Sequence, residues 1–99
     1  MTDNKKITKG FEKEAIKNLP NDKPVVYKIL NNENENIYTG VAKRGRVIGR
    51  LIEHLPGGID PIRGGKKVQI EKMKSIDDAI KKESNIISRT KPKFNKKGK

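Results

Sequence analysis

The chain has 99 residues, with 24 Lys and Arg against 12 Asp and Glu, which gives a formal net charge of +12. Only 31% of the residues are hydrophobic and 36% are charged, so the chain can build one domain with a small core. This excess of positive charge favours a polyanionic partner, and nucleic acid is the commonest one. The absence of cysteine and the single histidine exclude disulfides, thiolate sites and multi-histidine metal centres. A metal would need oxygen ligands, which is typical of Mg²⁺ or Mn²⁺.

The two ends of the chain are polar or basic. No apolar run approaches the roughly 18 residues of a membrane-spanning helix, so no membrane partner is expected. The first segment, MTDNKKITKG, lacks the apolar middle of a signal peptide, which favours a cytoplasmic protein. We expect residues 1–10 to form a flexible tail, residues 11–95 a single domain, and residues 96–99 a basic C-terminal tail.

Hydrophobic periodicity predicts alternating helices and strands within that domain. Helices are expected over residues 11–19, 47–55 and 76–89. Strands are expected over residues 24–30, 37–41 and 68–73, with a hairpin loop at 31–36. Ser75 precedes the last helix and is a typical capping residue. The expected fold class is α/β, a small three-stranded antiparallel sheet flanked by helices.

The only two tyrosines of the chain, Tyr27 and Tyr38, fall on the two strands of the expected hairpin. Strand alternation places Tyr27 on the same face as Val25 and Ile29, and Tyr38 on the same face as Gly40. Either the tyrosines pack on the sheet with their hydroxyls in water, or they line a site that cleaves phosphodiesters.

Three polar residues occupy unusual positions on the expected helices. Glu83 falls near the middle of the apolar stripe of the last helix, where a carboxylate is costly unless it is paired or bound to a cation. Arg50 and His54 are four residues apart and share a helix face, where they could bind phosphate. A salt-bridged glutamate and a solvated basic face are the alternative interpretations. A basic run precedes this helix and consists of Lys43, Arg44 and Arg46.

Taken in order, these segments resemble the GIY-YIG nuclease family, which includes the catalytic domain of the bacterial excision-repair nuclease subunit and homing endonuclease domains. The matching segments are VVY at 25–27, YTG at 38–40, AKRGRVIGRLIEHL at 42–55, Glu83, and KPKFN at 91–95. The match covers nearly the whole expected domain and implies a GIY-YIG-like fold.

The chain also departs from the family's pattern. Val25 and Val26 stand where the first motif has Gly and Ile, and Thr39 stands where the second motif has Ile. The loop before Arg50 is longer than usual, which leaves Arg46 as an alternative for the same role.

The resemblance implies a set of site residues. The catalytic residues would be Tyr27, Tyr38, Arg50, His54, Glu83 and Asn95. The substrate-binding residues would be Gly40, Lys43, Arg44 and Arg46. Glu83 would be the acidic ligand of one Mg²⁺ or Mn²⁺ ion, and Arg50 would neutralise the scissile phosphate. Either tyrosine would accept the proton of the attacking water.

The function implied by the resemblance is a divalent-metal-dependent endonuclease that hydrolyses phosphodiester bonds in DNA, with a link to DNA repair. DNA is the expected partner, with RNA as the alternative substrate. Its specificity would come from the structure of the substrate or from a partner. Two alternatives stay open: a non-catalytic, basic nucleic-acid-binding protein on the same scaffold, and a basic structural protein of a ribonucleoprotein.

Overall fold

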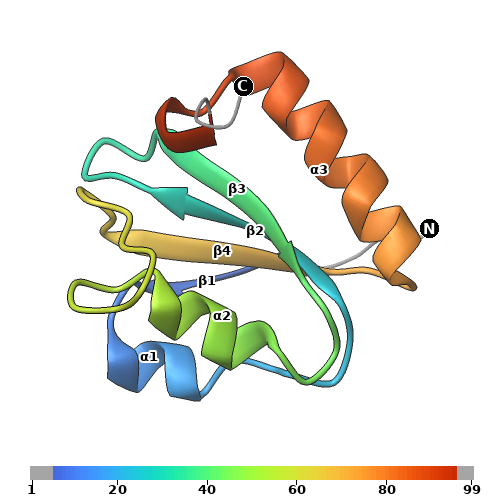
Figure 1. Ribbon diagram of the computed structural model, residues 1–99, viewed down its shortest axis with the longest axis horizontal. Coiled ribbons are helices and arrows are strands. Elements are labelled where there is room, and N and C mark those ends of the chain that lie inside the picture. The colour runs from blue at the N-terminus through green and yellow to red at the C-terminus, as the bar shows by residue number, and fades with distance from the viewer. Residues whose placement is uncertain (1–5, 96–99) are drawn as a thin grey trace.

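A four-stranded antiparallel sheet in the order β1-β4-β2-β3 forms the centre of the computed structural model, which describes residues 6–95 (Figure 1). The strands are β1 (Lys6–Gly10), β2 (Val25–Leu30), β3 (Asn36–Ala42) and β4 (Lys67–Lys72). The helices are α1 (Lys13–Lys17), α2 (Val47–Glu53) and α3 (Ile76–Thr90), followed by the short 3-10 helix η1 (Lys93–Asn95). The α/β class with an antiparallel sheet and flanking helices is confirmed. The tail predicted at 96–99 and residues 1–5 of the tail predicted at 1–10 lie outside the described residues.

The fourth strand, β1, corrects the sequence prediction, which assigned residues 1–10 to a flexible tail. Strand β1 pairs antiparallel with β4, from Lys6 opposite Glu71 to Gly10 opposite Lys67. Its sequence KITKG carries one large apolar residue, Ile7, and that side chain packs against the core. An outer strand that lies mostly in solvent needs little hydrophobic alternation, so the pattern on which strand prediction rests is missing here.

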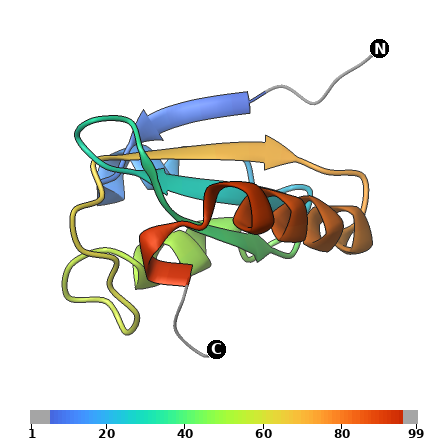
Figure 2. The ribbon, with the colours of Figure 1, turned by 90° about the horizontal axis from the view of Figure 1, so that it is seen from above.

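The helices cover opposite faces of the sheet, as the alternation of side chains along β2 requires. Tyr27 and Ile29 point into the larger core cluster, which includes Ile16 of α1 and Leu51 of α2. The neighbouring residue Val26 points the other way and packs with residues of α3. Figures 1 and 2 show α3 running along β3, apart from α1 and α2. Since β3 is an outer strand of the sheet, α3 lies near its edge.

Both ends of α3 follow the capping rules. The Ser75 hydroxyl accepts a hydrogen bond from the Asp78 amide at 3.1 Å, so the predicted cap of α3 is confirmed. Helix α3 ends at Thr90, where Lys91 adopts a left-handed backbone with φ of 46°. The first helix is shorter than the predicted 11–19.

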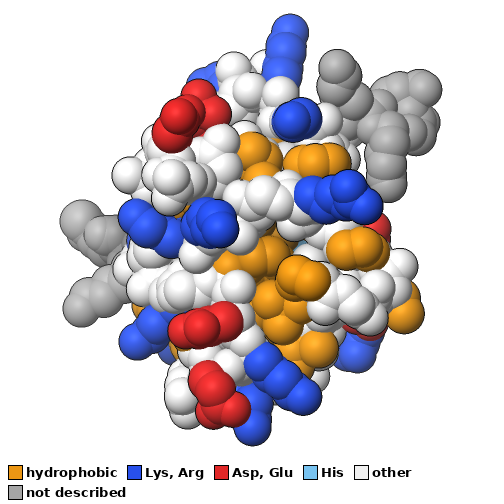
Figure 3. Space-filling view, turned by 90° about the vertical axis from the view of Figure 1, so that its left-hand side faces the viewer, with side chains coloured by type: hydrophobic (Ala, Val, Ile, Leu, Met, Phe, Trp, Pro, Cys, Tyr) orange, Lys and Arg blue, Asp and Glu red, His pale blue; other side chains and the backbone are white. Residues whose placement is uncertain are grey.

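On one side of the molecule the charged side chains of both signs are mixed (Figure 3). Figure 3 shows one end of the molecule, where Lys and Arg side chains are scattered among Asp and Glu around a central group of hydrophobic side chains. In its described part, this side of the molecule therefore presents no continuous basic patch (Figure 3). None of the helices in the described range 6–95 is long and apolar enough to cross a membrane.

Candidate functional site

The β2–β3 hairpin brings the two tyrosines together. Tyr27 lies opposite Gly40 and Tyr38 opposite Ile29, so the tyrosines are diagonal neighbours with ring centroids 6.1 Å apart. A Cβ atom at Gly40 would lie 2.6 Å from the Tyr27 hydroxyl oxygen and 2.7 Å from its Cζ. The space beside Gly40, which the resemblance assigns to substrate binding, is therefore filled by the Tyr27 ring.

A buried hydrogen-bond chain connects Tyr27 to the loop after α2. His54 is fully buried, its Nε2 lies 2.8 Å from the Tyr27 hydroxyl, and its Nδ1 lies 2.9 Å from the Asp60 carbonyl oxygen. A carbonyl can only accept, so Nδ1 carries the proton and Nε2 accepts the hydrogen bond from the Tyr27 hydroxyl. Burial lowers the pKa of His54, which favours the neutral ring at pH 7.

Arg50 is held beside this chain by two carboxylates. Its guanidinium lies 2.6 Å from Glu53 Oε1 and 3.5 Å from Asp60 Oδ2. As expected from their spacing, Arg50 and His54 share a face, because both lie within 4 Å of Asp60. Burial lowers the pKa of Arg50, but the hydrogen bond to Glu53 and the nearby tyrosines raise it by more. The net effect is a raised pKa, so Arg50 stays a cation. Two carboxylates thus fix its position without removing it from solvent.

The two tyrosines differ in their access to solvent. Tyr27 is 1% exposed, whereas Tyr38 is only half-buried. Burial raises the pKa of both hydroxyls, the negative charge of Glu83 adds to the increase, and Arg50 opposes it. Both tyrosines are therefore protonated at neutral pH. The charges of Glu83 on α3 and Arg50 on α2 thus act on the same pair of hydroxyls in opposite directions.

Glu83 has no partner within the described range of the chain. It lies on the packing side of α3 with the buried residues Ala79 and Ile86, and burial raises the pKa of its carboxyl. Among residues 6–95 its carboxylate forms no hydrogen bond or ion pair, so the salt-bridge interpretation finds no support there. A half-buried carboxylate without a partner is a suitable ligand for Mg²⁺ or Mn²⁺. No group of three acidic or histidine side chains lies within metal-binding reach in the described part, so a metal would rely on Glu83, water and substrate oxygens.

Asn95 links the end of the chain to β3. Its Oδ1 accepts a hydrogen bond from the Thr39 amide at 2.7 Å, and its Nδ2 donates to the Thr39 carbonyl at 2.9 Å. Both ends of the side-chain amide are therefore occupied by the backbone. We infer that Asn95 contributes to the site by fixing β3, which carries Tyr38.

We expect Asn95→Ala to lower the free energy of unfolding by roughly 1–3 kcal/mol, because two backbone hydrogen bonds are lost. Hydrogen exchange should show the Thr39 amide losing protection, since no other partner replaces the Asn95 oxygen. Asn85→Ala, at an exposed position of α3, is the control and should leave both quantities nearly unchanged. Unaltered protection of Thr39 would contradict the structural role of Asn95.

The three residues of the basic run before α2 differ in how close they lie to the site. Lys43 and Arg44 lie exposed in the turn between β3 and α2. Arg46 is 60% exposed at its side chain and lies 3.6 Å from Glu53, which also binds Arg50. Arg46 thus lies at the rim of the site.

Glu53 and Asp60 were missed by the sequence analysis. The pairing of Arg50 with Glu53 follows the helical i,i+3 spacing and could have been recognised. Asp60 gave no such signal, because it lies in the loop beyond α2, outside the helical spacing that relates Arg50 to Glu53, and its hydrogen bond to His54 is made by the backbone carbonyl.

Fold and site together define a small α/β domain in which two tyrosines, a histidine and an arginine lie together on an antiparallel sheet, and the charge of a glutamate on α3 acts on the tyrosine hydroxyls. No family model, curated protein or solved structure matches the chain.

Proposed function

We propose that the protein is a divalent-metal-dependent endonuclease that hydrolyses phosphodiester bonds in DNA, as its resemblance to the GIY-YIG nucleases implies. The observation that best supports this proposal is the half-buried carboxylate of Glu83, which has no hydrogen-bond or ion-pair partner among residues 6–95 and whose charge acts on both tyrosine hydroxyls. Burying a carboxylate without a partner costs folding free energy, and a bound cation would offset that cost. The cytoplasmic location inferred from the sequence belongs to the same proposal.

The proposed roles follow from charge and exposure. A Mg²⁺ or Mn²⁺ ion bound at Glu83 would supply positive charge against the phosphate and activate water. Arg50, held by Glu53 and Asp60, would stabilise the negative charge that develops on the scissile phosphate. Its fixed position reduces the reorganisation that the reaction requires.

Exposure favours Tyr38 as the residue that contacts the attacking water. The hydroxyl of Tyr27 is buried and hydrogen-bonded to His54, so we assign Tyr27 a positioning role beneath Tyr38. The half-buried Tyr38 hydroxyl can reach solvent and substrate. Because its pKa is raised, Tyr38 can accept a proton only where positive charge is close, and Arg50 already opposes that increase.

The test is cleavage of supercoiled and branched DNA with Mg²⁺ or Mn²⁺ by wild type, Tyr38→Phe and Tyr27→Phe. We expect Tyr38→Phe to slow cleavage by roughly 100-fold or more with an unchanged melting temperature. Tyr27→Phe should lower the melting temperature, because the buried Nε2 of His54 loses its donor at a cost of roughly 1–3 kcal/mol. Equal cleavage by Tyr38→Phe and wild type would contradict the role of Tyr38.

The alternative is a non-catalytic nucleic-acid-binding protein on this scaffold. The internal pairing of Tyr27 and His54 favours it, because both side chains have a complete structural explanation. The same assay separates the two: wild type that binds DNA and cuts none of the substrates with either metal would support the alternative and overturn the nuclease proposal.

A further inference from the structure

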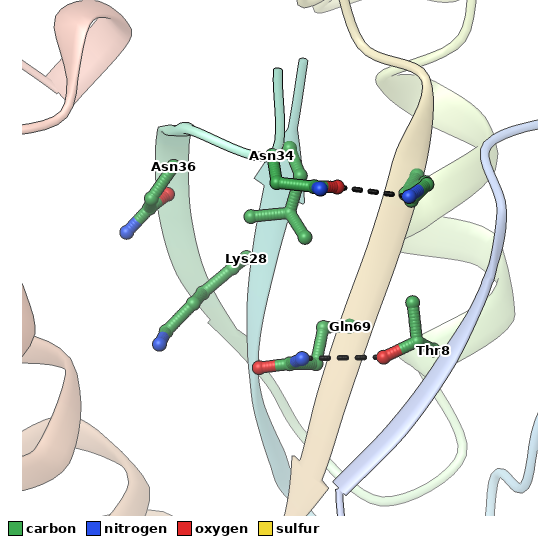
Figure 4. A pocket seen from close by; sticks show the side chains of 7 residues that line it. Thr8, Lys28, Asn34, Asn36 and Gln69 are labelled. Carbon is green, nitrogen blue, oxygen red and sulfur yellow. Dashed lines mark hydrogen bonds between the residues drawn. The ribbon is translucent and has the colours of Figure 1, made fainter. Parts of the chain in front are cut away.

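A groove lies on the sheet face opposite the tyrosines. Helix α3 packs there against Val26 and Val41, and it leaves the other half of that face open. Strand pairing places Thr8, Gln69 and Lys28 in one row across β1, β4 and β2 on the open half. The depression there has a volume of about 420 Å³ (Figure 4). Its polar lining consists of Thr8, Lys28, Asn34, Asn36, Lys67 and Gln69.

Two hydrogen bonds connect four of the residues that line the groove, and Lys28 takes part in neither. The Lys67 ammonium donates to the Asn34 side-chain oxygen at 2.8 Å, and the Gln69 amide donates to the Thr8 hydroxyl at 3.2 Å. In Figure 4 the Lys28 side chain extends from β2 away from both pairs. Within residues 6–95 its ammonium forms no hydrogen bond or ion pair. The groove therefore offers donors to a ligand from Lys28 and from the remaining N–H groups of Lys67.

Positive charge surrounds Lys28. Burial lowers its pKa, and the charges of Lys6, Lys82 and Arg89 lower it further, while Glu71 opposes them. Glu71 is also 3.6 Å from Lys82, so its charge is shared. An anion in the groove would relieve repulsion among these cations and would gain charge-assisted hydrogen bonds.

The chemistry of the lining limits what the anion can be. None of the residues that line the groove is aromatic, so stacking on bases is not available there. Ammonium and amide donors suit phosphate oxygens, and such contacts carry little sequence information. The groove is also open to solvent, which suits an extended polyanion.

We propose that this groove binds the phosphate backbone of duplex nucleic acid and forms a second contact surface, on the opposite face of the sheet from the candidate cleavage site. Tyr27 and Lys28 are consecutive residues of β2 with side chains on opposite faces, so the sheet itself separates the two surfaces. The proposal concerns binding and requires no cleavage. It can therefore fail or succeed independently of the nuclease activity.

The test measures binding of a fluorescent DNA duplex by anisotropy in EDTA over a range of salt concentrations. Lys28→Gln/Lys67→Gln is compared with Lys13→Gln/Lys17→Gln on α1, which removes the same number of charges. We expect the groove variant to bind at least tenfold more weakly at low salt. Its slope of log affinity against log salt should be shallower by about 1.8, because two phosphate contacts at about 0.9 each are lost. The α1 variant should keep the wild-type slope.

Further variants separate the groove from folding and from net charge. Lys28→Arg/Lys67→Arg retains both charges and should restore binding. If Lys28→Gln/Lys67→Gln unfolds, as monitored by circular dichroism, the exposed single change Lys67→Glu is compared with Lys13→Glu, and only the first should weaken binding. Equal losses at the groove and at α1 would overturn the proposal, because net charge alone would explain them. Wild-type binding by a folded groove variant would overturn it as well.

Discussion

Glu83→Gln is expected to reduce Mg²⁺-dependent cleavage by on the order of 100- to 1,000-fold, because the substitution removes the one carboxylate proposed to hold the cation. Metal-free DNA binding should not weaken, since the change removes a negative charge. The matched control is Glu33→Gln, an exposed carboxylate of the hairpin loop, which should cut as wild type does. A Glu83→Gln variant that cuts at the wild-type rate would refute the proposed metal site.

The same substitution has a stability signature that does not depend on activity. Burial raises the pKa of Glu83 in the folded state above its ordinary value of 4.5. A carboxyl whose pKa is raised in the folded state contributes to the free energy of unfolding at pH values below its pKa in the unfolded chain. This contribution is lost as the pH rises through its pKa in the folded state. Glutamine does not titrate, so only wild type loses this contribution. The melting temperature of Glu83→Gln relative to that of wild type should therefore increase as the pH rises above about 4.5.

Metal should reverse that difference. We expect added Mg²⁺ to raise the melting temperature of wild type at pH 7 and to leave Glu83→Gln nearly unchanged, because ligand binding stabilises only the form that binds. The Glu33→Gln control should respond as wild type does. An equal response of Glu83→Gln and wild type would indicate that the cation binds elsewhere.

Gly40→Ala is expected to lower the free energy of unfolding by about 1–3 kcal/mol or more, measured by urea denaturation. The added methyl would lie 2.7 Å from Tyr27 Cζ and 3.1 Å from Tyr38 Cε2, so both rings would have to move. Tyr27→Phe should not relieve the clash, because Cζ remains in phenylalanine.

Gly49→Ala provides the matched control on α2. Its Cβ would meet only the flexible end of the Arg46 side chain, at 3.3 Å. Replacing a glycine inside a helix by alanine raises the free energy of unfolding by about 0.5–1 kcal/mol, so this variant should be slightly more stable than wild type. If Gly40→Ala is as stable as Gly49→Ala, the tyrosine pair does not require a glycine beneath it.

Local patterns predicted those parts of the fold that depend on neighbours in sequence. The strands around Tyr27 and Tyr38 alternate, α3 has an apolar stripe, and Ser75 precedes it, so periodicity and capping were sufficient. The proximity of the tyrosines follows from the hairpin itself. The position of Glu83 within the stripe was visible for the same reason.

The parts that escaped prediction depend on distant contacts. Strand β1 is specified by its pairing with β4, and its polar sequence carries no period. Asn95 meets Thr39 across 56 residues of chain, so no local spacing indicates that its amide would be used by the backbone. His54 depends on the carbonyl of Asp60, and a backbone atom leaves no trace in the sequence.

The hydrogen bonds of Asn95 also affect how the sheet meets other copies of the chain. An outer strand normally offers free amides and carbonyls on which a second chain can add a strand and begin aggregation. The Asn95 amide occupies both outward groups of Thr39 in the middle of β3, as a paired strand would. The other outer strand, β1, carries the exposed Lys6 and Lys9, whose like charges repel an identical edge. Both edges are therefore poor templates for self-assembly, and Asn95→Ala should increase aggregation as well as lower stability.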